Sequence, residues 1–232
     1  MSLIRFFQSK QAFDALQLAK SAHFKVFGSF PITERTRLVL QAQRWSWPGR
    51  DFTVRDDTKG TLVARIQVHR YSFPNKRTLL DAASRPVALM KLHPYSFFNE
   101  QMVYERTDDD APLFTIKYRK NASFHQQECE LRNHVTGETH LLVLQPFNVL
   151  TRRSVLTDGD DGPILAKVHQ PFTWRLANRY EIVVADGVDT GVVTLMCAAM
   201  DEETRKRADW VFRGLVGFLG AMYGGLALTT LL

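Results

Sequence analysis

From Leu38 onward the chain consists of short runs of alternating or consecutive apolar residues, which acidic or glycine-containing turns separate. The turns begin at Asp56, Asp81, Asp108, Asn133 and Asp158. Consecutive turns therefore start 25, 27, 25 and 25 positions apart. A recurrence at a nearly fixed spacing predicts an internal structural repeat.

Each period has room for two strands, a tight turn between them and a longer link onward, so we expect the repeat to be a β-hairpin. Asp, Asn and Gly are residues that such turns favour. The predicted strands are Leu38–Gln41, Asp51–Arg55, Leu62–Ile66, Lys76–Leu80, Val87–Met90, Phe98–Glu105, Leu113–Ile116, Phe124–Asn133, His140–Leu144, Val149–Thr157, Ile164–Val168 and Arg179–Ala185. A sheet of about twelve strands rarely stays open, because its free edges would invite aggregation. The pattern therefore predicts a mainly β protein with a closed antiparallel barrel.

The stretch Val188–Met200 is apolar on every side and is followed by the acidic run 201–203. Asp189 can cap a helix here, because its carboxylate can accept the free N–H groups of the first turn. At ~1.5 Å per residue this helix cannot cross a ~30 Å hydrocarbon layer, so it requires burial within the protein. We predict a central helix at about residues 188–203, enclosed by the barrel and ended by the acidic run.

Residues 1–30 form a leader before the predicted barrel domain of residues 31–204. Within it, Gln8–Lys20 spaces Phe13 and Leu16 in the manner of a short amphipathic helix. Such a helix suits a mitochondrial presequence or a leader that packs on the domain. The Ser and Arg enrichment that is typical of presequences is missing, which favours the packed leader.

The C-terminal region, residues 205–232, has the composition of a short membrane anchor. The nineteen residues from Gly214 to the terminus carry no charge, and as a helix they would span ~28 Å. Trp210 stands where a membrane interface would lie. Gly220 and Gly224 form a small-xxx-small step that suits close helix packing. The same apolar helix could dock on the barrel or on a protein partner, so both alternatives stay open.

Composition adds a moderate charge bias. Lys and Arg number 30 against 24 Asp and Glu, which gives a net charge of +6 in 232 residues and a pI near 9.4. This balance favours anionic partners. The chain has two cysteines, Cys129 and Cys197, which indicates a reducing compartment. We therefore expect a cytoplasmic protein, with the C-terminal tail as its candidate membrane attachment.

The sequence has no Walker loop, Rossmann glycine fingerprint or nucleophile elbow, so we expect no catalytic residues and no cofactor. His69, His93 and His169 each close a predicted strand and could meet at one rim of the barrel. No closely spaced ligand pair accompanies them, so we interpret them as rim residues and predict no metal site. Nucleic acid is not expected as a partner, because the positive charge is spread over strands and no recognition helix is visible.

Basic residues recur along the predicted strands, where alternation would place them on the outer wall. They are Arg65, Arg70, Lys76, Arg77, Lys91, Lys117, Arg119, Lys120, Arg152, Arg153 and Lys167. Ammonium and guanidinium groups on the wall could hold anionic lipid head groups. Ordinary solvation of the wall is the alternative interpretation.

The densest basic cluster is Lys117–Lys120, in which Tyr118 would lie against a membrane interface. The candidate lipid-binding residues are Lys91, Lys117, Tyr118, Arg119, Lys120, Arg152 and Arg153. The candidate anchor residues are Trp210, Gly220 and Gly224.

Three stretches of the chain resemble the LURP-one-related family. They are Thr61–Ile66, Arg77–Leu89 and Tyr180–Val193, with Asp201 and Glu202 closing the helix that follows. The resemblance covers roughly residues 30–203. It implies a twelve-stranded barrel threaded by a hydrophobic helix, the fold that this family shares with tubby C-terminal domains and phospholipid scramblases.

The two related groups imply different functions. Tubby domains bind phosphoinositide head groups through basic residues on the barrel wall, and scramblases are associated with calcium-dependent lipid movement. Only Asp186 and Asp189 remain here of the acidic segment that serves calcium in scramblases. The leading hypothesis is therefore a non-catalytic, membrane-associated module that binds anionic, phosphoinositide-like lipid. An adaptor that uses the C-terminal helix for a protein partner and a scramblase-like protein are the alternatives.

Overall fold

Twelve strands close into a barrel in the computed structural model, which describes residues 10–20, 24–30, 35–42, 51–69, 76–93, 100–105, 111–119, 126–148, 152–171 and 179–202. The strands are β1 (Thr36–Ala42), β2 (Phe52–Asp56), β3 (Leu62–Val68), β4 (Arg77–Asp81), β5 (Pro86–Leu92), β6 (Gln101–Tyr104), β7 (Phe114–Tyr118), β8 (Gln127–Arg132), β9 (Thr139–Asn148), β10 (Arg153–Asp158), β11 (Ile164–His169) and β12 (Arg179–Val184). Each overlaps one predicted strand, so the mainly β prediction is confirmed.

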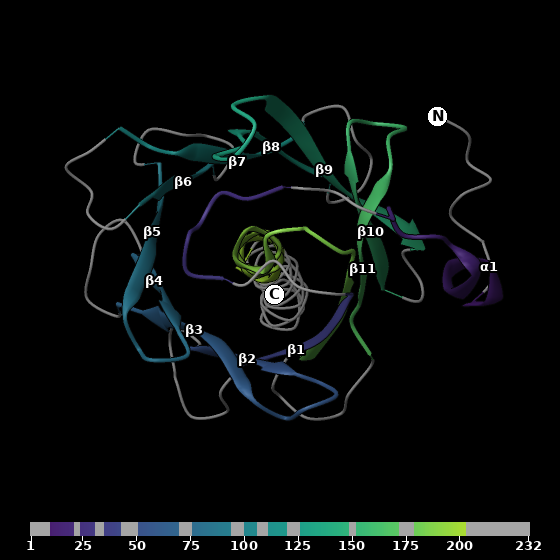
Figure 1. The fold of residues 1–232 in the computed structure, drawn as a ribbon, viewed down its shortest axis with the longest axis horizontal. Coiled ribbons are helices and arrows are strands. Elements are labelled where there is room, and N and C mark those ends of the chain that lie inside the picture. Colours follow the sequence, from purple (N-terminus) through teal and green to yellow (C-terminus); the bar gives the residue numbers. More distant parts are fainter. Residues whose placement is uncertain are drawn as a thin grey trace, which may run out of the picture.

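The barrel is a continuous meander in which every strand pairs antiparallel with its neighbours in sequence. Pairing of β1 with β12, from Thr36 opposite Val184 to Gln41 opposite Arg179, closes the ring. Figure 1 shows the strands as a ring around the predicted central helix. Closure removes the two free edges that an open sheet would expose.

The predicted turns connect the hairpins where the structure describes them. Gly60 and Gly137 occupy positive φ angles of 67° and 73° in the β2–β3 and β8–β9 turns, a backbone conformation that glycine adopts without steric cost. The turn predicted at Asp108 lies outside the described residues. Turn chemistry at the repeat spacing therefore marks hairpins, as the sequence indicates.

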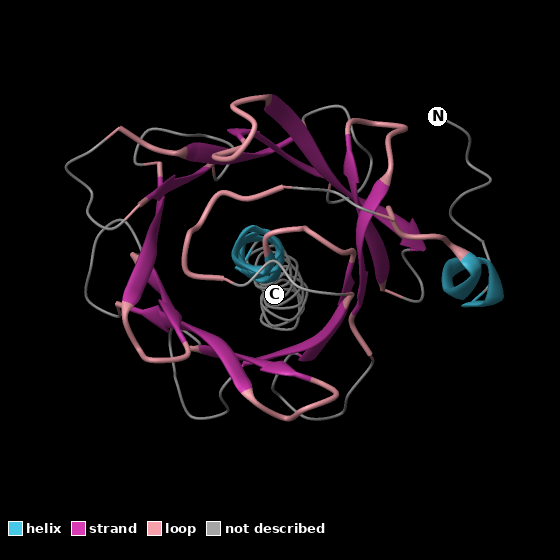
Figure 2. Cartoon of the chain, in the orientation of Figure 1, coloured by secondary structure: helices cyan, strands magenta, loops and turns pink. Residues whose placement is uncertain are grey.

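The central helix lies inside the ring of strands (Figure 2), and its described residues are buried except for partly buried Met200. Residues 190–202 are helical, and Val192, Leu195 and Met196 are at most 1% exposed. Asp201 and Glu202 lie within the predicted helix range of about 188–203, and each is only 3% exposed. Polar side chains from the barrel wall compensate the burial of these acids, as described below.

The leader contacts the barrel at two places, and the first is a short helix on the outer wall. Helix α1 (Lys10–Ala15) inserts Phe13 beside Phe147, with ring centroids 5.3 Å apart. The helix ends at Ala15 and not near Lys20 as predicted. Its last carbonyls are satisfied by Lys167 of β11, whose Nζ donates to Phe13, Asp14 and Leu16 at 3.2, 3.0 and 3.1 Å.

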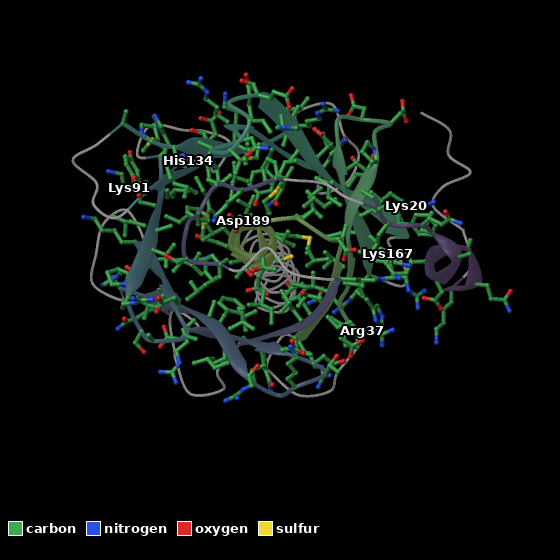
Figure 3. The ribbon with its side chains drawn as sticks, in the orientation of Figure 1. Lys20, Arg37, Lys91, His134, Lys167 and Asp189 are labelled. Atoms are coloured by element: carbon green, nitrogen blue, oxygen red, sulfur yellow. The ribbon has the colours of Figure 1, made fainter. Side chains whose placement is uncertain are left out.

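This packing corrects the prediction that every basic strand residue lies on an exposed wall. Lys167 and Arg153 do point outward, but α1 covers them and each is only 7% exposed. Figure 3 shows Lys167 between the barrel and α1. Burial lowers the pKa of the Lys167 ammonium. Both side chains therefore serve to hold the leader helix.

The second contact is made by residues 24–30, which we call the N-terminal strap and which closes the barrel mouth beside the start of the central helix. Asp189 joins the strap to the helix: its Oδ2 accepts N–H bonds from Val26 and Phe27 at 2.9 and 2.7 Å. Its Oδ1 accepts the Gly191 N–H at 2.8 Å, which confirms the predicted cap. Figure 3 places Asp189 at the centre of the barrel. Phe24, Phe27 and Phe30 of the strap belong to the main core.

Gly191→Ala tests the fit between strap and helix. A Cβ at this position would lie 2.6 Å from Phe30 and 2.9 Å from Phe27, so we expect a loss of about 1–3 kcal/mol in the free energy of unfolding. Helix propensity alone would predict the opposite effect, a gain of ~1 kcal/mol in the free energy of unfolding. Gly28→Ala is the control, because a Cβ there meets nothing within 4 Å. Urea denaturation measures both, and a stabilised Gly191→Ala variant would contradict the packing argument.

Candidate functional site

Polar side chains that we call the collar hold the last described residues of the central helix, 196–202. They come from the first, second or last residues of five strands and are Arg77, Gln101, Tyr118, Gln127 and Tyr180. At this rim of the antiparallel barrel, odd-numbered strands end and even-numbered strands begin. The five collar residues therefore lie far apart in sequence, over more than one hundred positions.

Arg77 was predicted on the outer wall, and this prediction is wrong. Its Nη2 lies 2.6 Å from Glu202 Oε2, and its Nη1 donates to the Ala198 carbonyl at 3.1 Å. Both charged side chains are buried, at 7% and 4% exposure. Gln101 adds a 3.4 Å bond from its Nε2 to Glu202 Oε2. The pairing explains how the acid Glu202 can be buried in the central helix.

Tyr118 also points into the barrel and not toward a membrane interface as predicted. Its hydroxyl lies within hydrogen-bond distance of the Ala199 carbonyl oxygen, at 2.9 Å, and of the Gln127 side-chain amide. Gln127, in the amide orientation that satisfies its neighbours, donates to the Met196 carbonyl and accepts from the Met200 N–H at 3.1 Å each. These contacts assign Tyr118 and Gln127 to the support of the helix.

Tyr180 completes the collar by donating its hydroxyl to Asp201 Oδ1 at 2.8 Å. Burial, together with the Asp201 carboxylate, raises the pKa of Tyr180 well above its ordinary value. The phenol therefore stays protonated and remains a donor at neutral pH. The collar is thus a structural device whose hydrogen bonds are directed at the helix.

Several of the candidate lipid-binding cations are engaged within the protein. Arg119 forms ion pairs with Glu128 and Asp160, and hydrogen bonds to these carboxylates raise its pKa. Lys91 places its Nζ 4.4 Å from the centre of the Tyr104 ring, a cation–π distance. Arg153 lies 5.5 Å from the Phe13 ring and is buried.

The other candidates differ in how the structure places them. Arg152 is exposed at a positive φ of 51° just before β10. Lys120 lies outside the described residues, and so do the anchor candidates Trp210, Gly220 and Gly224. Lys117 projects from the outer face of β7 into solvent. The described lipid-binding candidates are therefore spread over several strands of the barrel.

Lys117 instead belongs to a hollow that we call the wall groove, on the outer face of β7, β8 and β9. The groove has a volume of about 360 Å³, and its lining includes Leu113, Lys117, Glu130, Arg132 and Leu141. All five side chains are exposed. Strand pairing brings them together, because Thr115 faces Glu130 and Glu130 faces Leu141.

Three charges in the wall groove lack an ion-pair partner within the described part of the chain: Lys117, Glu130 and Arg132. Arg132 donates from Nε to the Gly137 carbonyl at 3.0 Å, which orients the guanidinium without neutralising it. The remaining groove acid, Glu128, is taken up by Arg119 at 2.6 Å. The groove therefore presents two cations and one carboxylate to a ligand.

Exposed apolar side chains gather at the same part of the barrel. Leu113, Val135 and Leu141 are 40%, 65% and 37% exposed, and they are the large apolar residues exposed among those described. Leu113 and Leu141 line the wall groove, and Val135 lies in the β8–β9 turn beside it. Exposed apolar residues next to charged ones are typical of binding surfaces.

The strand-end histidines contact polar neighbours. His69 Nε2 lies 2.8 Å from the Thr78 hydroxyl, and His169 Nδ1 lies 3.4 Å from Glu181. No group of three or more His, Cys, Asp or Glu side chains within the described ranges is placed to hold a metal ion. Both cysteines are buried and free, and burial raises the pKa of Cys197 to about 12.

Within the part of the chain that the structure describes, no helix combines the length and the apolar character needed to span a bilayer.

The architecture defines a class, a closed meander of twelve antiparallel strands wound around one buried helix, and comparisons identify the family. The LURP-one-related family model matches residues 36–201, so the chain belongs to that family. Protein LURP-one-related 13 of Arabidopsis thaliana is 25% identical over 156 residues, which cover 65% of this chain and 84% of that protein. LURP-one-related 10 from the same plant is 20% identical over 163 residues, covering 66% and 82%.

A solved structure supports the same fold. The X-ray structure of an Arabidopsis thaliana protein matches with a TM-score of 0.53 and 18% identity, covering 75% of this chain and 94% of that one. At this identity the likeness establishes the fold and carries no function.

Proposed function

We propose that the protein is a non-catalytic, membrane-associated binding module that recognises anionic lipid head groups through the wall groove. The observation that carries the proposal is the combination of exposed Leu113 and Leu141 with Lys117 and Arg132, two cations without ion-pair partners among the described residues. Leucine at a membrane surface removes apolar area from water, while lysine and arginine attract anionic lipid.

The magnitudes favour a weak, salt-sensitive contact. A Lys or Arg near an anionic membrane surface contributes ~1 kcal/mol, and this attraction decreases beyond a Debye length of ~8 Å at physiological salt. The last described residue of the central helix, Glu202, lies at the collar, and the collar is at the opposite end of the barrel from the β8–β9 turn. In this proposal, a C-terminal tail inserted in the membrane would act as a second, separate attachment.

The test is co-sedimentation with vesicles of phosphatidylcholine alone and of phosphatidylcholine mixed with an anionic lipid. We expect binding only to the anionic vesicles, weaker at higher salt, and reduced about fivefold by Lys117→Ala, which corresponds to the ~1 kcal/mol of one surface cation. Lys59→Ala is the matched control, because Lys59 is an exposed lysine in the β2–β3 turn, away from the groove.

Equal loss in Lys117→Ala and Lys59→Ala would show that only net charge matters and would argue against the groove. Absence of binding to all vesicles would remove the proposal and favour an adaptor, for which the exposed leucines would contact a protein. Deleting residues 211–232 in parallel separates the contribution of the tail from that of the groove.

A further inference from the structure

We infer that the wall groove is selective for a phosphoserine head group, that of phosphatidylserine in a membrane. This inference rests on the proposed function and names its lipid. It follows from the signs, number and positions of the three groove charges that lack an ion-pair partner among the described residues, and from the leucines beside them.

The charges fit a ligand of opposite pattern. Lys117 and Arg132 supply two positive groups, and Glu130 supplies one negative group. A phosphoserine head group carries a phosphate, a carboxylate and an ammonium. Each charge of the head group therefore has a partner of opposite sign, and none of the three groove charges remains unpaired. Such complementarity gives selectivity as well as attraction.

The positions of the three side chains allow a small head group to lie among them. Glu130 and Arg132 are two residues apart on β8, so they project from the same face. Lys117 on β7 faces Glu128 and is the diagonal neighbour of Glu130, and such neighbours are ~7–8 Å apart. The groove volume of about 360 Å³ is at the small end of the ~300–1,000 Å³ range of ligand sites.

The chemistry also discriminates against other common lipids. Phosphatidylglycerol has no ammonium for Glu130, and phosphatidylcholine has neither a carboxylate nor an N–H donor. A phosphoinositide carries several phosphates and no cation, so Glu130 would face like charge. The planar guanidinium of Arg132 suits the two oxygens of a carboxylate, and the Lys117 ammonium suits a phosphate. Leu113 and Leu141 would lie against the glycerol and upper acyl chains.

The experiment compares phosphatidylcholine vesicles that contain phosphatidylserine or phosphatidylglycerol at the same mole fraction. Both anionic lipids carry one net negative charge, so surface charge is matched. We expect about fivefold tighter binding to phosphatidylserine, the effect of one exposed charge pair. Glu130→Gln should abolish this preference while leaving phosphatidylglycerol binding unchanged or slightly stronger.

Glu138→Gln is the control, since it makes the same charge change at an exposed acid in the β8–β9 turn outside the groove lining. It should keep the preference for phosphatidylserine. Circular dichroism of each variant establishes that the barrel is folded.

Equal binding to the two anionic lipids, or preference for phosphoinositide vesicles, would overturn the phosphoserine inference and leave the proposed function standing. Absence of binding to every anionic vesicle would overturn both. Soluble glycerophosphoserine should compete only weakly, because it lacks the acyl chains that contact the leucines. Full competition at the concentration of the lipid would mean a soluble ligand and would contradict the membrane assignment.

Discussion

Arg77→Met should lower the free energy of unfolding by about 3–5 kcal/mol, the range for removing one partner of a buried ion pair. The substitution leaves Glu202 with its side chain only 4% exposed and without its 2.6 Å guanidinium partner. It also removes the donor to the Ala198 carbonyl. Urea denaturation followed by tryptophan fluorescence would measure the loss, which is a large part of the ~5–15 kcal/mol of a typical domain.

A double-mutant cycle identifies the cause of this loss. Replacing Arg77 and Glu202 together by Met and Leu should cost less than Arg77→Met alone, because no uncompensated charge remains buried. Arg85→Met is the contrasting variant: Arg85 is paired with Asp81 at 2.8 Å, but its side chain is 76% exposed. We expect Arg85→Met to lower the free energy of unfolding by at most about 1 kcal/mol. Strictly additive effects of the Arg77 and Glu202 substitutions would contradict the proposed coupling.

The hairpins could be predicted from the sequence because two local signals agree. Turn residues recur at nearly constant spacing, and the runs between them alternate in polarity, as in β3 (Leu62–Val68). A closed barrel then follows from the number of strands. The central helix could be predicted because residues 188–200 offer no polar face for solvent.

The predictions for Arg77 and Tyr118 are wrong because they place both side chains on the outer side of the barrel. Alternation contained the correct signal, since Arg77 shares its face with buried Leu79, and Tyr118 shares its face with buried Phe114 and Ile116. The strand sequences do not show that carbonyl and carboxylate groups of the central helix lie inside the barrel beside Arg77 and Tyr118. That environment exists only once strands far apart in sequence have closed around it.

The wall groove could not be predicted either, for a related reason. Lys117, Glu130 and Leu141 lie on three different strands, and only the pairing register places them on one surface. The burial of Lys167 depends in the same way on where α1 docks. Local pattern determines which face a side chain takes, while its neighbours depend on register and docking.

Asp189→Ala should release the N-terminal strap and destabilise the protein by about 3 kcal/mol. The Asp189 side chain accepts N–H bonds from Val26, Phe27 and Gly191, and each buried donor left without a partner costs ~1–3 kcal/mol. The substitution also removes the unfavourable burial of a carboxylate, which offsets part of the cost of the three unpaired N–H groups. We therefore expect a loss at the lower end of their summed cost. Hydrogen exchange should accelerate most at the Val26 and Phe27 amides.

Asp186→Ala is the matched control, because it removes an aspartate from the same turn whose buried Oδ1 has no hydrogen-bond partner among the described residues. We expect no loss of stability and unchanged exchange in the strap. Equal effects of the Asp186 and Asp189 substitutions would show that the turn, and not the bonds to the strap, determines stability.

The pH dependence gives an independent test of the same carboxylate. Burial raises the pKa of Asp189 above its ordinary value of 3.8, against the lowering effect of its N–H donors. As the pH falls, the folded protein therefore takes up this proton before the unfolded chain does. Between the raised pKa and 3.8, the stability of wild type relative to Asp189→Asn should increase with falling pH. A difference that stays constant over this interval would mean that Asp189 is not held in the buried position between strap and helix.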